Sequence, residues 1–516
     1  MRGTRLKQRD IFYILLTSIG LISIFPPFPF GFIAPIVLVP FFLFLERKSI
    51  NESAKGAYIA GMIWSGGTVY WIGWATFPGL IGSILFLPIY FVIFTVIIKF
   101  LWSRWGNKSL WTAPLLWTGV ELLNSWGPLA FPWNKLAYSQ SSYPILIQYA
   151  DIFGAYGVTF WIVTLNVIFY FLLKNIKRKK EAFRFVAAII LLYTIVMVYG
   201  VVSLKRPIAV EERVRLSLVQ GNIDPYKKWT STFIDSNFAI YHRLTDEVAS
   251  ERPDLIIWPE TAATCYLRYN YKYLRMVKSQ IDSIGISLVT GSPDYIWKRY
   301  RGRMTFNSAL YFQPNSWEIG RYYKMNLVPF SEKVPFMDKF PFIYDFLRKL
   351  NLEVGDFTPG DSTVVFQLKK KDSEKVVPFS VVICYESVFP YLVRKFVNYG
   401  AKFLVVITND GWFGRTSGPY QHAQIAVFRA VENRVWVARC ANTGISEFID
   451  PYGRVTSRTP LYEEAVLSGV ITTSSRSTFF VHYGMVTVYL IATGNVFVLF
   501  IYILRMRKRS QDERKI

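Results

Sequence analysis

Three reactive side chains each follow a short run typical of a buried β-strand. Glu260 ends the run 255–260, Lys324 follows Arg-Tyr-Tyr at 321–323, and Cys384 follows an apolar run that starts at residue 376. A carboxylate, an ammonium and a thiol can together transfer an acyl group. The carboxylate takes the thiol proton, the thiolate attacks a carbonyl, and the cation with backbone N–H groups stabilises the oxyanion. Taken singly, each residue also has a plain structural explanation, since an isolated Cys is most often an inert buried side chain.

The elements that would position these residues lie between residues 208 and 483, where the composition is that of a soluble α/β domain. Short runs of apolar and β-branched residues predict strands at 214–219, 255–258, 286–290, 308–312, 364–367, 377–383, 403–408, 436–439 and 447–449. Helical periodicity between several of them predicts helices at 232–248, 272–284 and 421–432. Ligands bind beyond the carboxyl ends of strands in open α/β sheets, so the position of Cys384 suits catalysis.

The composition of the whole chain indicates a membrane protein. Of its 516 residues 52% are hydrophobic and 17% aromatic, yet its formal net charge is +24. This pairing is typical of apolar spans with basic cytoplasmic ends. Nucleic-acid binding would need a basic stripe on a folded face, whereas many of the basic residues form short clusters beside apolar segments. We therefore expect no nucleic-acid partner.

Eight apolar segments predict eight membrane spans, at 11–24, 31–45, 56–74, 80–101, 110–123, 156–173, 185–204 and 485–504. The first two are shorter than the roughly 20 residues that a perpendicular span needs. Basic clusters precede the first span and follow the second, fourth, sixth and eighth, which places both termini in the cytoplasm. No small-x-small cleavage site follows the first segment, so we expect an anchor and not a signal peptide. The predicted domains are a membrane domain at 1–207, a catalytic domain outside the membrane at 208–483, and a final span with a basic tail at 484–516.

Several motifs resemble those of the nitrilase, or carbon–nitrogen hydrolase, superfamily. They are Trp258-Pro-Glu260, Tyr323-Lys324, Val328-Pro-Phe-Ser-Glu332, Cys384-Tyr-Glu386 and Asn409-Asp-Gly-Trp-Phe413. With the flanking spans, Gln220-Gly-Asn-Ile223 and Asn442-Thr-Gly444, nearly the whole chain is similar to the bacterial apolipoprotein N-acyltransferase family. Ser331 stands where that family's pattern has a glycine, which puts the local turn in doubt and leaves the chemistry unaffected.

The resemblance implies a four-layer αββα sandwich inserted in an eight-helix transmembrane bundle, in the inner membrane with the catalytic domain in the periplasm. It implies a catalytic triad of Glu260, Lys324 and Cys384. It further implies two groups of assisting residues: Glu332, Tyr385 and Glu386 in support of the triad, and Trp229, Asn409, Trp412 and Phe413 in substrate binding. The implied reaction is ping-pong. Cys384 takes an acyl chain from a membrane phospholipid and passes it to the α-amine of a lipoprotein's N-terminal S-diacylglyceryl-cysteine.

Two stretches rich in aromatic and apolar residues, 265–276 and 336–350, are candidates for contact with lipid, and ordinary packing over the sandwich is the alternative. The three histidines are scattered without ligand spacing, so we expect neither a metal site nor a His-based triad. No glycine-rich nucleotide motif accompanies a strand, so no cofactor is expected. Cys265 and Cys440 are predicted to be structural, without a disulfide.

Two other functions stay open at this point. The first is a membrane-tethered amidase that uses the same triad on a small amide, with water as the acceptor. The second is a transporter whose outside domain binds solute. A transporter would be expected to carry ionisable residues inside its spans, and the clear candidate is Glu121, near a helix end. Transport is therefore the lowest-ranked function.

Overall fold

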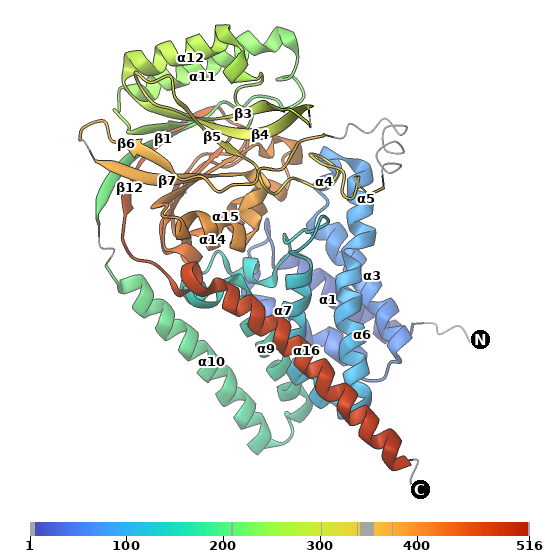
Figure 1. Cartoon of the computed structure of the whole chain (residues 1–516). Helices are drawn as coiled ribbons and strands as arrows, with labels where there is room; N and C mark the ends of the chain where they lie inside the picture. The colour runs from blue at the N-terminus through green and yellow to red at the C-terminus, as the bar shows by residue number, and fades with distance from the viewer. Residues whose placement is uncertain are drawn as a thin grey trace. The chain divides into compact units, whose positions relative to one another are not determined.

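The computed structural model describes residues 6–207, 210–300, 302–337, 339–340, 355–373 and 375–513 (Figure 1). The chain divides into two compact units. A helical unit comprises Met1–Trp126, Ala130–Leu204 and Tyr483–Ile516, and an α/β unit comprises Gly127–Leu129 and Lys205–His482.

The helical unit is built from α-helices joined by short turns and 3₁₀ segments. Its helices are α1 (Gln8–Ser23), α2 (Val39–Leu45), α3 (Ile50–Thr68), α4 (Ile72–Ala75), α5 (Phe77–Phe86), α6 (Pro88–Trp105), α7 (Ala113–Leu123), α8 (Pro144–Ile147), α9 (Ala150–Asn175), α10 (Lys179–Lys205) and most of α16 (Phe479–Glu513). Its 3₁₀ segments are η1 (Gly31–Ile36), η2 (Gly106–Thr112) and η3 (Leu136–Gln140). The start of α3 shows how the sequence sets a boundary. The Ser49 hydroxyl accepts a hydrogen bond from the backbone N–H of Glu52, and the Glu52 carboxylate accepts a hydrogen bond from the backbone N–H of Ser49.

Four stretches of the described chain are long and apolar enough to cross a membrane, so this is a membrane protein. They are Phe77–Leu123, Ala150–Asn175, Lys179–Lys205 and Phe479–Ile501. The first contains two of the predicted spans, 80–101 and 110–123. Helix α10 exposes apolar side chains such as Ile190 and Val198, at 61% and 56%, and a bilayer would cover them. The remaining spans of the predicted eight, and the domain boundaries, stay predictions.

The α/β unit contains two six-stranded sheets. The first has the order β12-β1-β2-β3-β4-β5 and the second β11-β10-β9-β8-β7-β6. In each sheet three central strands are parallel, β1-β2-β3 and β7-β8-β9, and the outer pairings are antiparallel. The strands of the first sheet are β1 (Glu212–Gln220), β2 (Leu255–Ile257), β3 (Ser287–Lys298), β4 (Gly302–Phe312), β5 (Ile319–Tyr323) and β12 (Ala465–Thr473). Those of the second are β6 (Phe366–Lys369), β7 (Val376–Ile383), β8 (Phe403–Thr408), β9 (Trp436–Ala441), β10 (Glu447–Ile449) and β11 (Val455–Arg458).

Two pairs of helices complete a four-layer sandwich (Figure 1). Helices α11 (Ile234–Ala249) and α12 (Tyr271–Ile284) cover the first sheet, and α14 (Pro390–Asn398) and α15 (Gly418–Asn433) cover the second. The inner faces of the sheets meet where β1 contacts β9 and β4 contacts β7. This arrangement confirms the predicted αββα sandwich.

Local sequence explains the boundaries of α12. The side chain of Asn270 caps its first turn, and Gly285 ends it in the left-handed conformation, at φ 64°. Its buried residues Tyr273, Val277 and Ile281 recur every four positions and pack into the core between helix and sheet. The same core holds Trp258, which is fully buried just before Glu260.

All nine predicted strands and all three predicted helices of this unit are present, with ends shifted by a few residues. The largest differences are in β3, which continues eight residues past residue 290 to Lys298, and in β4, which begins six residues before residue 308. Strands β11 and β12 were not predicted, and β5 was indicated only by the run Arg-Tyr-Tyr at 321–323. A glycine at the centre of β12, Gly469, interrupts its apolar pattern, and its lack of a side chain leaves room for the ring of Phe448.

Candidate active site

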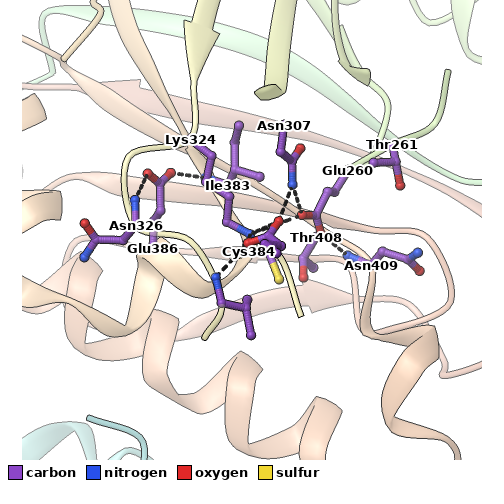
Figure 2. A network of polar contacts seen from close by, with 12 residues as sticks. Glu260, Thr261, Asn307, Lys324, Asn326, Ile383, Cys384, Glu386, Thr408 and Asn409 are labelled. Atoms are coloured by element: carbon purple, nitrogen blue, oxygen red, sulfur yellow. Dashed lines mark hydrogen bonds and ion pairs between the residues drawn. The ribbon is translucent and has the colours of Figure 1, made fainter. Parts of the chain in front are cut away.

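The carboxyl ends of strands from both sheets bring Glu260, Lys324 and Cys384 together. Glu260 follows β2 and Lys324 follows β5, both in the first sheet, while Cys384 follows β7 in the second. Figure 2 shows the three side chains beside one another, with the Lys324 ammonium nitrogen 3.5 Å from Glu260 Oε1. Glu260 and Lys324 are buried, at 7% and 1% exposure, and Cys384 is partly exposed. Cys384 is thus the least buried of the three residues.

The carboxylate of Glu260 is held by donors from three elements. Its Oε1 accepts from Asn307 Nδ2 at 2.8 Å and from Lys324, and its Oε2 accepts from the backbone N–H of Asn409 at 3.0 Å (Figure 2). A carboxylate that accepts several hydrogen bonds is fixed in place. Glu260 is therefore an oriented carboxylate next to the thiol.

A second carboxylate, Glu332, binds the other side of Lys324. It lies 2.9 Å from the Lys324 ammonium, accepts from Asn307 Nδ2 at 2.8 Å and accepts from the backbone N–H of Val328 at 2.8 Å. Burial by itself lowers the pKa of Lys324, but the two carboxylates, with Glu332 the stronger, together raise it above its ordinary value. Lys324 is therefore a permanent cation, suited to stabilising negative charge and unsuited to acting as a base.

Cys384 has an unusual backbone conformation at the start of the 3₁₀ segment η6 (Cys384–Val388). Its φ of 50° lies in the left-handed region, which costs a residue with a side chain roughly 1–3 kcal/mol and occurs most often at functional sites. Two contacts restrain its carbonyl: the Ser387 hydroxyl donates to it at 2.8 Å, and His422 Nε2 lies 3.3 Å away.

Burial raises the pKa of the Cys384 thiol, and the neighbouring charge of Glu260 raises it further. Lys324 and a hydrogen bond with Thr408 act in the opposite direction but do not offset the rise. At neutral pH the resting sulfur is therefore protonated. Attack by this sulfur on a carbonyl requires a base that removes the proton during the step, and Glu260 is in place to do so.

Glu386 joins the segment that carries Lys324 to the strand that carries Cys384. Its Oε1 accepts hydrogen bonds from the Tyr322 hydroxyl and the Met325 backbone N–H, both at 2.6 Å, and from the Asn326 backbone N–H at 3.3 Å. Its Oε2 accepts a hydrogen bond from the Ile383 backbone N–H at 2.8 Å. Burial raises the pKa of Glu386 to about 7 despite these donors. One fully buried carboxyl group thus fixes the distance between two of the three reactive residues.

A second polar network lies behind Cys384. Asp410 accepts hydrogen bonds from Thr408, His422 Nδ1 and Arg439, at 2.9, 2.9 and 2.6 Å, and His422 Nε2 reaches the Ser387 hydroxyl at 2.9 Å. Burial opposes the charge of Asp410, but the Arg439 guanidinium and His422 hold the pKa of this carboxyl well below its usual range. His422 therefore acts by hydrogen bonding, as its isolation from other histidines in the sequence suggested.

The residues predicted to bind substrate lie in different surroundings. Asn409 reaches the triad through its backbone N–H. Trp412 packs edge-on against Tyr226, with ring centroids 5.2 Å apart, and belongs with Phe413 to the 3₁₀ segment η7 (Asp410–Phe413). Trp229 is 46% exposed. A role in substrate binding stays a prediction for all four residues. Tyr385, which was predicted to support the triad, is buried against Phe389, and its supporting role also stays a prediction.

The first predicted lipid-contact stretch, 265–276, is divided between surface and core. Tyr269 and Tyr271 are exposed, at 48% and 68%, whereas Leu267 and Tyr273 belong to the core, so lipid contact is wrong for these two. Most of the second stretch, including Phe342, Ile343, Phe346 and Leu347, lies outside the described residues. Phe336 and Phe340 are exposed, at 42% and 48%.

Several residues of the site were not predicted from the sequence. Asn307 donates to both Glu260 and Glu332, and Asp410 and Arg439 carry the network behind the thiol. Each is a single polar residue within or just after an apolar strand, which gives no local signal of its partners. Cys265, Cys384 and Cys440 are free thiols. In the part of the chain that the structure describes, no group of three His, Cys, Asp or Glu side chains is placed to hold a metal ion.

Comparisons with known proteins match both units of the chain. Residues 17–168 match the family model of the apolipoprotein N-acyltransferase N-terminal domain, and residues 215–478 match that of the carbon–nitrogen hydrolases. The apolipoprotein N-acyltransferase of Geobacter metallireducens is 33% identical over 95% of this chain and 94% of its own length. That of Chlorobaculum tepidum is 31% identical over 92% of this chain and 93% of its own. Among solved structures, Saccharomyces cerevisiae Nit3, a member of the nitrilase superfamily, is 18% identical and covers 51% of this chain and 91% of its own, at a TM-score of 0.38.

Proposed function

Because the chain belongs to the apolipoprotein N-acyltransferase family, with a catalytic unit of the carbon–nitrogen hydrolase superfamily, we propose that Cys384 carries the acyl group between two substrates. The activity itself is acyl transfer to an apolipoprotein, which sets aside the amidase and transporter alternatives. The acyl donor, the covalent intermediate and the roles of individual residues are the content of the proposal.

The first half-reaction acylates the enzyme from a membrane phospholipid. Glu260 removes the thiol proton of Cys384 as the sulfur attacks the ester carbonyl. The tetrahedral oxyanion is stabilised by Lys324 and by backbone N–H groups at the start of η6. The C–O bond of the ester then breaks, and the proton held by Glu260 passes to the departing oxygen. The products are a thioester on Cys384 and a lysophospholipid.

The second half-reaction passes the acyl group to the lipoprotein. The α-amine of its N-terminal S-diacylglyceryl-cysteine attacks the thioester carbonyl, and Glu260 accepts a proton from the nitrogen. The C–S bond breaks, and the sulfur regains a proton. The products are an amide and the free thiol, so the enzyme returns to its starting state.

The observation that carries this proposal is the contact of Lys324 with two carboxylates beside a protonated thiol. Glu332 neutralises the ammonium on one side, which leaves Glu260 less firmly paired, at 3.5 Å against 2.9 Å. Glu260 is therefore the carboxylate that can take up a proton without breaking the shorter ion pair.

For the membrane topology we propose eight spans, with both termini in the cytoplasm and the catalytic unit outside it, in the periplasm. Support comes from the basic clusters that follow every second apolar segment. The orientation can be tested with two single-cysteine variants in a background that carries Cys265→Ser and Cys384→Ser. One variant has a cysteine at Tyr300, which is 90% exposed, and the other has a cysteine at Lys177, between α9 and α10. A membrane-impermeant maleimide should label Tyr300→Cys in cells with a permeabilised outer membrane, and Lys177→Cys only after lysis. The reverse pattern would refute the orientation.

Mass spectrometry of the enzyme incubated with phospholipid alone tests the intermediate. We expect one fatty acyl increment on the peptide that contains Cys384, and its loss when the diacylglyceryl acceptor is added. Cys265→Ser is the matched control, because Cys265 is also a partly exposed free thiol. Acyl transfer that persists in Cys384→Ala, or an increment that moves to another residue, would contradict the proposal.

A further inference from the structure

Lys228 is a buried lysine beside the proposed base, and the reaction described above does not use it. Its side chain is 2% exposed, and its ammonium group forms no ion pair with the described residues. Its hydrogen bonds go to Thr261 alone, to the carbonyl oxygen at 3.2 Å and to the hydroxyl oxygen at 2.5 Å. A buried ammonium without a paired carboxylate is unfavourable, so its position calls for an explanation beyond packing.

Thr261 directly follows Glu260, and its backbone is strained. Its φ of 50° lies in the left-handed region, which a β-branched residue rarely adopts. Lys228 bridges the carbonyl and the hydroxyl of this one residue and so holds it in that conformation. A change in the backbone at Thr261 would turn the preceding residue, Glu260, away from Cys384.

Lys228 also acts on Glu260 through its charge. Burial lowers the pKa of Lys228 to about 8, and the negative charge of Glu260 acts against that decrease. The two opposite charges therefore attract each other across the site. The other titratable groups at Glu260 are the ammonium of Lys324, itself shared with Glu332, and the thiol of Cys384.

We propose that Lys228 is a positioning residue of the acylation step, which clamps Thr261 and thereby keeps Glu260 directed at Cys384. This inference rests on the proposed acyl-enzyme intermediate. It assigns Lys228 no contact with substrate. Its effect reaches the reacting atoms through Glu260.

The inference is tested by single-turnover acylation of the full chain by phospholipid, without the acceptor amine. The acylated fraction is measured by mass spectrometry between pH 5 and pH 8. Lys228→Met removes the charge and the donors at similar length, and Lys228→Arg restores the charge. Thr261→Val removes one acceptor of the clamp and leaves the charge in place. The matched control is Lys278→Met, because Lys278 is equally buried but contacts Asp282 and the Gln313 carbonyl, both at 2.9 Å.

We expect Lys228→Met to acylate about 100-fold more slowly at pH 7, the scale of a displaced catalytic group. Lys228→Arg should recover most of that rate, because it returns a buried cation that can donate to Thr261. Thr261→Val should slow the reaction about tenfold, and Lys278→Met should leave the rate unchanged.

Three results would overturn the inference. They are a wild-type rate in Lys228→Met, an equal loss of rate in Lys278→Met, and a wild-type rate in Thr261→Val. If Lys228→Met does not fold, Lys228→Arg and Thr261→Val still decide the outcome. If the wild-type enzyme acquires no acyl group on Cys384, the proposed function itself is refuted. This outcome is distinct from a failure of the Lys228 inference, because it is observed without any variant.

Discussion

Replacing Gly291 with alanine should displace Glu260 without touching any charged group. Gly291 lies in β3, and the loop that carries Glu260 crosses directly over it: the Gly291 N–H donates to the Pro259 carbonyl at 3.1 Å, and the Ala263 N–H donates to the Gly291 carbonyl at 3.0 Å. An added Cβ would lie 2.5 Å from the Thr261 nitrogen and 2.6 Å from Glu260 Cα. These are backbone atoms, so no flexible side chain can move aside.

The size of the displacement follows from those distances. Ordinary van der Waals contact begins at 3.4 Å, so the loop must move by about 0.9 Å, the difference between 3.4 and 2.5 Å. A misplacement of about 1 Å at a reacting group can slow a reaction about 100-fold, and overpacking of a core typically costs about 1–3 kcal/mol of stability. Gly291→Ala is therefore expected to be folded but about 100-fold slower in forming the thioester.

The assay compares the acylation rate with the unfolding temperature of the same preparation. Gly469→Ala is the matched control, since its Cβ would approach the Phe448 ring to 2.9 Å on the edge strand β12, away from Glu260. It should lose stability and keep the acylation rate. A Gly291→Ala enzyme within twofold of the wild-type rate would show that the close approach over β3 does not set the position of the base.

Three further substitutions test the surroundings of the site. Glu386→Gln would turn an amide N–H₂ toward a backbone N–H, so we expect about 2–4 kcal/mol lower stability in denaturant titrations and at least tenfold slower acylation. Asp410→Asn would remove the carboxylate that lies 2.6 Å from the buried Arg439 guanidinium, and thermal unfolding should show a loss of about 3–5 kcal/mol. Burial raises the pKa of Glu447 from 4.5 to about 7. Between these two pH values the folded state therefore binds more protons than the unfolded state. The contribution of Glu447 to the stability of the fold consequently decreases as the pH rises from 4.5 to about 7. Glu447→Gln should flatten this fall, and an unfolding temperature that differs between pH 5 and pH 8 by as much as in the wild type would contradict the assignment.

The sequence predicted those parts of the fold and of the site that depend on local patterns. Strands such as β7 and β8 were found because both are runs of mostly apolar and β-branched residues, most of them buried in the second sheet. Glu260 and Cys384 were singled out because each ends such a run, and Lys324 because it follows Arg-Tyr-Tyr at 321–323. Their assignment as a triad came from the resemblance to the nitrilase motifs. The parallel course of β2 and β3, and of β7 and β8, then brings their carboxyl ends to one edge of each sheet.

Residues that depend on the pairing of distant strands could not be predicted. Asn307 contacts Glu260 because the register of β3 with β4 places it beside Pro293, and nothing near it in the sequence specifies that register. The left-handed backbone of Thr261 and Cys384 was equally hidden, since residues with a side chain give no sign of a positive φ. Lys228 was overlooked because an isolated lysine is normally solvated, and only its 2% exposure sets it apart.

The chemistry of the site does not by itself distinguish hydrolysis of an amide from transfer of an acyl chain, since a carboxylate, an ammonium and a thiol can serve both. The apolar helices make the difference. Moving an acyl chain of sixteen carbons fully into water would cost about 12 kcal/mol, at about 0.8 kcal/mol per CH₂ group, so a soluble enzyme would meet its substrate too rarely. Four long apolar stretches keep this enzyme in the bilayer, where the proposed phospholipid donor resides. The proposed thioester also reacts with water, so productive transfer requires that the acceptor amine reach Cys384 before water does.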